Sequence, residues 1–393
     1  MRRIYIHHLS TSLSRATDSP VTPKLPAASE AQHAVPGPDD ADTNLKEKEE
    51  PLAMKSIKQE NEMLSQVAVL NAKAIRYNKF NTLLATNPVV DLVPLHEIRG
   101  SVWKLLLGYL PASLERRDAT LARKRSEYQN LAAENQHHLI PPDDQSGKRR
   151  VCAASLPFMR DNALFRCEKI QRSLERILYC WAIRHPASGY VQGMPRIFPF
   201  TAGINDLATP FISVFFSPAD QQRIIAARAE ESKAVDAIIA KVEADTFWCL
   251  TKLLDGIQDN YTTAQPGIQR QIVRLHELVQ RIDAPLSRHL DDHDIQFIQF
   301  SFRWMNCLLM REISLPHIVR MWDTYLAEGE TTAFSDFHLY VCAAFLARFS
   351  AQIRAMREFQ DILVFLQQGM PEIAAAWNES DVELLLSEAF MNK

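Results

Sequence analysis

The chain is poor in the features that mark several large classes of protein. It has only 11 glycines among 393 residues, which argues against a turn-rich β protein. It contains no apolar run of the roughly 18 residues that a membrane-spanning helix needs. Its six cysteines show neither zinc-ribbon spacing nor a CxxC pair, and its net charge of -3 gives no overall attraction to nucleic acid. These absences predict a helical globular protein with no membrane span, no metal site and no nucleic-acid partner.

The first 54 residues differ in composition from the rest of the chain. Six prolines precede residue 52, and an alternating basic and acidic run, KEKEE, occupies residues 46–50. Such a segment cannot bury enough apolar surface to fold, so we predict a disordered leader over residues 1–54 that offers contacts to adaptor proteins. Residues 1–16 are basic and free of acids, which is also typical of a mitochondrial transit peptide.

Beyond the leader the pattern predicts helices almost throughout, and hence an all-α fold. We expect a helical lead-in over residues 55–92, a main domain over 93–330, and three further helical runs over 331–393 that pack on the same domain. Apolar residues at steps of three and four predict amphipathic helices over residues 235–261 and 267–282. Residues 116–135 are rich in charge and alanine, which fits a surface helix better than a basic nucleic-acid patch.

The stretch 181–193, WAIRHPASGYVQG, carries the strongest local signal. Pro186 disfavours helical geometry at the residue before it, so the preceding amphipathic helix should end near Arg184 and a tight loop should follow. That loop would present Gln192, followed by Gly193, where a missing side chain lets another backbone or a phosphate come close. On these residues alone, a plain helix-loop-helix corner with a surface glutamine is the alternative.

This stretch resembles the Tyr-x-Gln-Gly motif of the TBC-domain family, the Rab GTPase-activating proteins, here Tyr190 to Gly193. Two other pieces resemble the family in the same order along the chain. Residues 98–111, IRGSVWKLLLGYLP, look like its opening helix, and Arg303, Trp304 and the RMWDTY run at 320–325 look like its later helices. The resemblance implies a two-lobed array of helices with a groove near Gln192.

The resemblance also implies a mechanism, namely stimulation of GTP hydrolysis by a Rab-type small GTPase. Family members are understood to insert two side chains into the nucleotide site: a glutamine that orients the attacking water and an arginine that neutralises developing charge. Gln192 would be that glutamine, and the residues expected to bind the partner are Tyr190, Gly193, Asn205, Asp206, Arg99 and Trp103. The protein would need no cofactor of its own, because GTP and Mg²⁺ belong to the partner. The subgroup that the chain resembles is associated with the Golgi, which implies a cytoplasmic protein at the periphery of Golgi membranes.

The sequence departs from the family pattern twice. The Ile-x-x-Asp-x-x-Arg motif that holds the family arginine is missing from residues 149–167, where Arg160 is the nearest candidate. Residues 194–203, MPRIFPFTAG, then intervene between Gly193 and Ile204, although the family glycine leads directly into a hydrophobic residue and an asparagine.

We attribute both departures to mistranslated or retained non-coding sequence, which sequencing the messenger RNA across residues 145–210 tests. If the departures are genuine, the alternative function is a catalytically impaired Rab-binding or adaptor scaffold, because an arginine supplied in trans is worth about 10³ to 10⁵ in rate.

Two further groups of residues have simpler explanations than a site. His289 and His293 stand four residues apart, but the glutamate of HExxH and a third ligand are missing, so we expect a solvated segment between helices and no zinc hydrolase. We expect Arg303, Arg311 and Arg320 to pair with Asp323 or Glu312 rather than with phosphate.

Overall fold

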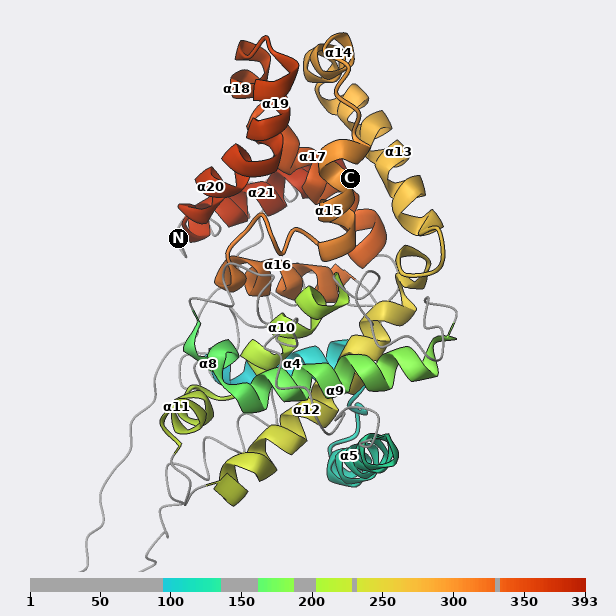
Figure 1. Cartoon of the computed structure of the whole chain (residues 1–393), viewed down its shortest axis with the longest axis vertical. Coiled ribbons are helices and arrows are strands. Elements are labelled where there is room, and N and C mark those ends of the chain that lie inside the picture. The colour runs from blue at the N-terminus through green and yellow to red at the C-terminus, as the bar shows by residue number, and fades with distance from the viewer. Residues whose placement is uncertain (1–94, 136–161, 187–202, 228–231, 329–332) are drawn as a thin grey trace, which may run out of the picture. The chain divides into compact units, whose positions relative to one another are not determined.

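The computed structural model describes residues 95–135, 162–186, 203–227, 232–328 and 333–393. All of these residues belong to one compact unit, Glu50–Lys393. They form helices and connecting turns, with no β-strand among them (Figure 1), so the predicted all-α class is confirmed. The predicted leader over 1–54 and the lead-in over 55–92 lie outside the described residues.

A first group of helices surrounds the long helix α12 (Ser232–Asp255). It contacts α5 (Arg117–Glu134), α9 (Glu168–Arg184) and α10 (Ile204–Phe215), while α4 (Leu95–Leu106) packs on α10. Shorter elements complete the group: η2 (Leu114–Arg116), α8 (Ala163–Arg166) and α11 (Pro218–Ala226). The short η5 (Gln258–Asn260) follows α12 and packs against the first helix of the second group. The predicted helix over 235–261 is too long, because Gly256, a poor helix former, follows the last residue of α12.

A second group is built on α13 (Pro266–Ile282) and α17 (His338–Arg348), which pack against each other. Its other helices are α14 (Ala284–Asp292), α15 (Ile298–Cys307), α16 (Leu315–Glu328), α18 (Ser350–Ala355), α19 (Phe359–Val364), α20 (Met370–Ala375) and α21 (Glu379–Asn392). Two short π-helical segments, η6 (Ala333–Phe337) and η7 (Phe365–Gly369), interrupt them. The tail therefore holds more elements than the three runs predicted.

Helix α10 joins the two groups. It contacts α4, α9 and α12 of the first group and α15 and α16 of the second. Its first nine residues, Ile204–Ile212, are all buried, as expected of a helix that is enclosed on every side. One continuous apolar core therefore runs through both groups, and the predicted two-lobed array is confirmed for the described part of the chain.

Buried carboxylates on α12 tie the first group together. Asp245, with 1% of its side chain exposed, accepts hydrogen bonds from Lys104 (2.6 Å), from the Tyr109 hydroxyl (2.8 Å) and from two nitrogens of Arg125 (2.8 Å each). Burial alone would raise the pKa of Asp245, but Arg125 and Lys104 outweigh it and hold the pKa below its usual value. Two residues earlier, Glu243 accepts bonds from three further side chains, which are Tyr128, Ser173 and Arg176.

Burial also accounts for the described cysteines. Cys180, Cys249, Cys307 and Cys342 are buried thiols, whereas Cys167 is partly exposed. Burial together with the nearby Glu243 raises the pKa of the Cys180 thiol to about 11, so this thiol stays protonated. None of the described helices is long and apolar enough to cross a membrane.

Candidate functional site

The candidate catalytic residues fall between described elements. Tyr190, Gln192 and Gly193 lie in residues 187–202, and Arg160 lies in residues 136–161, so all four are outside the described residues. The structure does describe the two elements on either side of residues 187–202, which we call the glutamine segment. These two elements are the end of α9 and the start of α10.

The end of α9 is held against α12. The His185 ring stacks on the buried Trp181 ring, with centroids 4.4 Å apart, and His185 Nδ1 lies 2.8 Å from the Trp181 carbonyl oxygen. The preceding Arg184 lies over one ring of Trp248 on α12. The helix ends at Arg184, as Pro186 predicted, so the glutamine segment departs from a fixed point.

The start of α10 is packed against the end of α15. A Cβ atom added at Gly203, the N-cap of α10, would lie 2.5 to 2.7 Å from three atoms of Asn306, a distance that real side chains do not reach. The Asn306 carbonyl oxygen accepts a 2.7 Å hydrogen bond from the hydroxyl of Tyr261, which is 1% exposed. Gly203 is therefore a glycine because the approach of α15 leaves no room for a side chain.

A buried ion pair fixes the first turn of α10. The Asp206 side chain is fully buried, and its Oδ2 accepts a 2.8 Å hydrogen bond from Nε of Arg311. Burial raises the pKa of Asp206, and Arg311 opposes that shift. The neighbouring Asn205 is 5% exposed. Asp206 therefore holds the start of α10 in place, and roles of Asn205 and Asp206 in partner binding stay predictions.

The turn between Asn306 and Arg311 has an uncommon backbone. Leu308 and Leu309 both adopt left-handed conformations, with φ of 48° and 59°, and both are fully buried. Such a conformation costs about 1 kcal/mol or more for a residue with a Cβ, and it persists where the surroundings enforce it. Both leucine side chains lie in the apolar core, and the turn brings both Asn306 and Arg311 onto the start of α10.

Arg99 and Trp103 on α4 meet at one buried carboxylate. Asp323 on α16 accepts a 2.7 Å hydrogen bond from Trp103 Nε1 and a 3.2 Å bond from Arg99 Nε. Burial raises the pKa of Asp323 against the opposing effect of Arg99. Trp103 has no exposed surface, whereas the Arg99 side chain is 20% exposed, so of these two only Arg99 could touch a partner directly.

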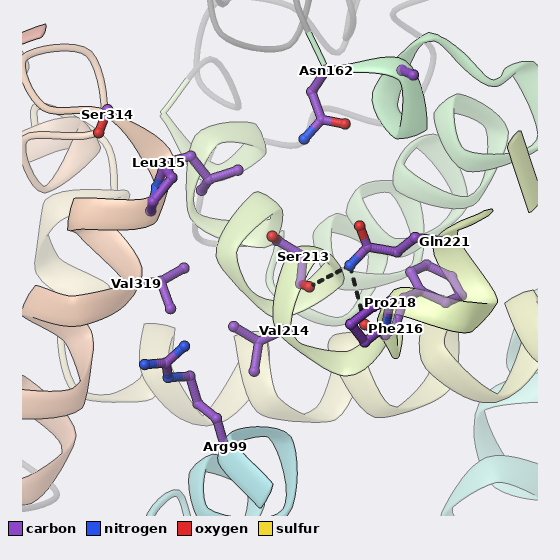
Figure 2. A pocket seen from close by; sticks show the side chains of 12 residues that line it. Arg99, Asn162, Ser213, Val214, Phe216, Pro218, Gln221, Ser314, Leu315 and Val319 are labelled. Atoms are coloured by element: carbon purple, nitrogen blue, oxygen red, sulfur yellow. Dashed lines mark hydrogen bonds between the residues drawn. The ribbon is translucent and has the colours of Figure 1, made fainter. Parts of the chain in front are cut away.

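An open cleft of about 740 Å³ lies at the other end of α10. Figure 2 shows Arg99 at its base, with Ser314, Leu315 and Val319 of the α16 region on one side and Ser213, Val214 and Gln221 on the other. Gln221 Nε2 donates to the carbonyl oxygens of Ser213 and Phe216, both at 3.1 Å. Asn162, two residues after Arg160, also lines the cleft.

The other pairs predicted from the sequence are partly confirmed. Arg303 pairs with the buried Glu312 through two hydrogen bonds, as predicted. The other two arginines choose different partners, because Arg311 binds Asp206 and Arg320 binds Glu383. Sequence reasoning missed the contact of Tyr261 with Asn306, which joins residues 45 positions apart and leaves no local pattern.

The histidine pair belongs to a helix rather than to a connecting segment. His289 lies inside α14 and His293 caps it, with ring centroids 4.3 Å apart. Burial and the neighbouring His293 lower the pKa of His289. No group of three or more potential metal ligands comes together within the described ranges.

Comparison with known proteins gives consistent matches along the chain. The sequence profile of the Rab-GTPase-TBC domain family matches residues 96–354. The GTPase-activating protein gyp1 of Schizosaccharomyces pombe is 50% identical over 347 residues, which cover 84% of this chain and 63% of that protein. TBC1 domain family member 22A of Homo sapiens is 45% identical, with 84% of this chain and 62% of that protein covered. The chain thus spans just under two thirds of the length of these curated relatives.

A solved structure matches as well. The crystal structure of the Ypt/Rab-GAP domain of Gyp1p aligns with a TM-score of 0.62 and 42% sequence identity, and the match covers 76% of this chain and 88% of that one.

Proposed function

Because this chain belongs to the Rab-GTPase-TBC domain family, we propose that it stimulates GTP hydrolysis by a Rab-type small GTPase. The observation that carries the proposal is the Tyr190 to Gly193 motif, placed inside the 96–354 range that the family profile matches. The GTPase would bring the bound GTP and Mg²⁺, so this chain would contribute side chains and no cofactor.

In this proposal Gln192 orients the water that attacks the γ-phosphate. A side chain can do this only if its backbone is held in place, because catalysis by positioning depends on a fixed geometry. The stacked end of α9 and the packed start of α10 supply fixed points on both sides of the glutamine segment. Arg160 is the candidate for the charge-neutralising arginine, a role worth about 4 to 7 kcal/mol of barrier.

The missing arginine motif favours a second candidate function, a scaffold that binds a GTPase or an adaptor without accelerating hydrolysis. The two functions make different predictions for the same measurement. A catalyst shortens the lifetime of bound GTP, whereas a scaffold binds the GTP-loaded protein and leaves the lifetime unchanged.

Single-turnover GTP hydrolysis by a panel of purified Rab proteins tests the proposal. We expect the full chain to accelerate at least one Rab by 100-fold or more, on the order of one supplied catalytic group. Gln192→Ala should lose at least ten-fold of that effect, and Arg160→Ala reports whether Arg160 is the arginine. Gln280→Ala, at an exposed position of α13, is the matched control and should change the rate by less than two-fold. Binding without acceleration on any Rab supports the scaffold, and neither binding nor acceleration contradicts both functions.

We further propose that the protein acts at the cytoplasmic side of Golgi membranes and that residues 1–54 contact adaptor proteins. The support is the subgroup resemblance and the leader's composition. Imaging of the full chain and of a variant without residues 1–54, beside a Golgi marker, tests both statements. Diffuse distribution of the full chain would contradict the Golgi assignment.

A further inference from the structure

The corner between α10 and α11 presents an exposed serine, Ser217, which is followed directly by Pro218. We propose that Ser217 is a phosphorylation site for a proline-directed protein kinase, with ATP as the phosphoryl donor. This modification involves no GTPase, so it can be tested whether or not the chain accelerates GTP hydrolysis.

Burial separates Ser217 from the other residues of the same local sequence. The serines and threonines that precede a proline are Ser19, Thr22, Thr209 and Ser217. The first two lie outside the described residues. Thr209 lies inside α10 with no exposed surface, and its hydroxyl donates a 3.2 Å hydrogen bond to the carbonyl oxygen of Asn205. Ser217 is exposed, and so are the two residues that follow it. Of the two described hydroxyls, only that of Ser217 is within reach of an enzyme.

The backbone at Ser217 also suits a kinase, which binds the residue that it modifies in an extended form. Ser217 has φ -63° and ψ 155°, and Phe216 before it has φ -84° and ψ 126°, so both are extended. The proline that follows Ser217 favours this conformation. Ser113, ahead of η2, is exposed and extended as well, with φ -67° and ψ 123°, but Leu114 follows it. Ser113 therefore matches Ser217 in every respect except the proline.

The reaction replaces the O–H bond of Ser217 by an O–P bond. The Ser217 Oγ attacks the γ-phosphorus of ATP, and the bond from that phosphorus to the β-phosphate oxygen breaks, so ADP leaves. The hydroxyl proton passes to a carboxylate of the kinase. The modified side chain carries about two negative charges near pH 7, and its Oγ no longer holds a hydrogen.

The loss of that hydrogen changes the cap of α11. In the unmodified chain, the Ser217 Oγ accepts a 3.1 Å hydrogen bond from the Asp220 amide and donates a 2.7 Å bond to the Asp220 Oδ2. Phosphorylation removes the donated bond and places a dianion against this carboxylate. The start of a helix attracts anions, but the Asp220 carboxylate is in direct contact, and a phosphate beside an aspartate is destabilising. We expect the first turn of α11 to loosen.

This turn forms one wall of the open cleft described above. Phe216 and Pro218, on either side of Ser217, line the cleft together with Gln221 (Figure 2). Gln221 ties α11 to the end of α10 through two 3.1 Å hydrogen bonds. Among the described residues that line the cleft, Arg99 alone carries a charge. A phosphate on Ser217 would therefore change both the shape and the charge of this wall.

Phosphorylation of the purified full chain tests the site. The chain carries Ser19→Ala and Thr22→Ala, and it is incubated with ATP, Mg²⁺ and a mitogen-activated protein kinase whose activity is checked on a standard protein substrate. We expect at least about 0.5 mol of phosphate per mol of chain, located at Ser217 by tandem mass spectrometry. Adding Ser217→Asn keeps a good helix cap but removes the hydroxyl, and it should lower incorporation at least about ten-fold.

Two more variants separate the role of the proline from that of exposure. Pro218→Ala should lower incorporation at Ser217 at least about ten-fold, because the kinase class requires the proline and the first position of a helix accepts alanine. Ser113→Ala is the matched control and should leave incorporation unchanged.

Hydrogen–deuterium exchange measures the structural effect. Phosphorylation should raise exchange in residues 219–226 at least about three-fold and leave α13 and α17 unchanged. Asp220→Asn removes the charge that the phosphate opposes, so phosphorylation of this variant should raise exchange in the same residues by less than about 1.5-fold.

The outcomes bear on separate claims. No incorporation by an active kinase overturns the site, as does incorporation that persists in Ser217→Asn or that is equally strong at Thr209. Incorporation that is indifferent to Pro218→Ala overturns the kinase class. Exchange in α11 that phosphorylation leaves unchanged, or an equal rise in Asp220→Asn, overturns the effect on the cap.

Discussion

Replacing Arg311 by methionine tests how strongly the buried ion pair holds α10. The substitution leaves the fully buried Asp206 carboxylate without its counter-charge, and breaking a buried pair from one side costs about 3 to 5 kcal/mol. The Arg311 side chain is 28% exposed, so solvent already screens part of its attraction to Asp206. In the variant, the unpaired Asp206 carboxylate can also lose its charge by taking up a proton. We therefore expect a loss of about 3 kcal/mol in the free energy of unfolding near pH 7.

The pH dependence of that loss identifies its cause. Burial already raises the pKa of Asp206 in the folded protein, and removing Arg311 raises it further, so the folded variant binds a proton more readily than the unfolded chain does. The deficit should shrink as the pH falls, by up to about 1.4 kcal/mol per pH unit.

Urea unfolding followed by far-ultraviolet circular dichroism measures both effects. Arg172→Met breaks an exposed pair with Glu168, in which both side chains are at least 65% exposed, and should cost less than about 0.5 kcal/mol. A deficit in Arg311→Met below about 1 kcal/mol near pH 7, or one that is flat with pH, would refute the reasoning.

Three further predictions use other buried groups. Burial lowers the pKa of His338 to about 4, so the folded state resists protonation of this ring. The free energy of unfolding should therefore fall by up to roughly 3 kcal/mol as the pH drops from about 6.5 to about 4. Urea titrations at several pH values should show a weaker acid dependence in His338→Gln than in the unchanged protein. Asp245→Asn leaves Lys104 and Arg125 without their carboxylate and should cost about 3 kcal/mol, read as a lower urea midpoint. Trp103→Phe removes a 2.7 Å hydrogen bond to a buried carboxylate and should lower the unfolding free energy by about 1 to 3 kcal/mol; an unchanged thermal midpoint would contradict this.

The sequence predicted the parts of the fold that depend on local patterns. Pro186 marks the end of α9, and Pro266 at the first position of α13 suits the predicted start of that helix. The helix predicted over 235–261 runs beyond Asp255, because apolar periodicity continues through Ile257 into the turn that follows. Periodicity thus locates helices well and their ends less well.

The site was less predictable because its contacts join distant residues. Asp323 binds Trp103 across 220 positions, and the contact between Asn306 and Gly203 depends on the left-handed turn after α15. No local signal in the sequence marks Leu308 as left-handed, since leucine seldom adopts that conformation. The resemblance supplied the candidate residues, and the structure supplied the surroundings of the described ones.

The packing of α21 affects how the protein can be shortened. The family profile ends at residue 354, inside α18, yet α21 packs on α16 and α17 and places Val382, Leu385 and Ala389 in the core with no exposed surface. A splice form, protease cut or expression fragment that stops at the profile boundary would uncover apolar surface on α16, the helix that carries Asp323. Such products should aggregate or be degraded in cells, so loss of activity on trimming the C-terminus would reflect lost folding rather than a missing functional segment.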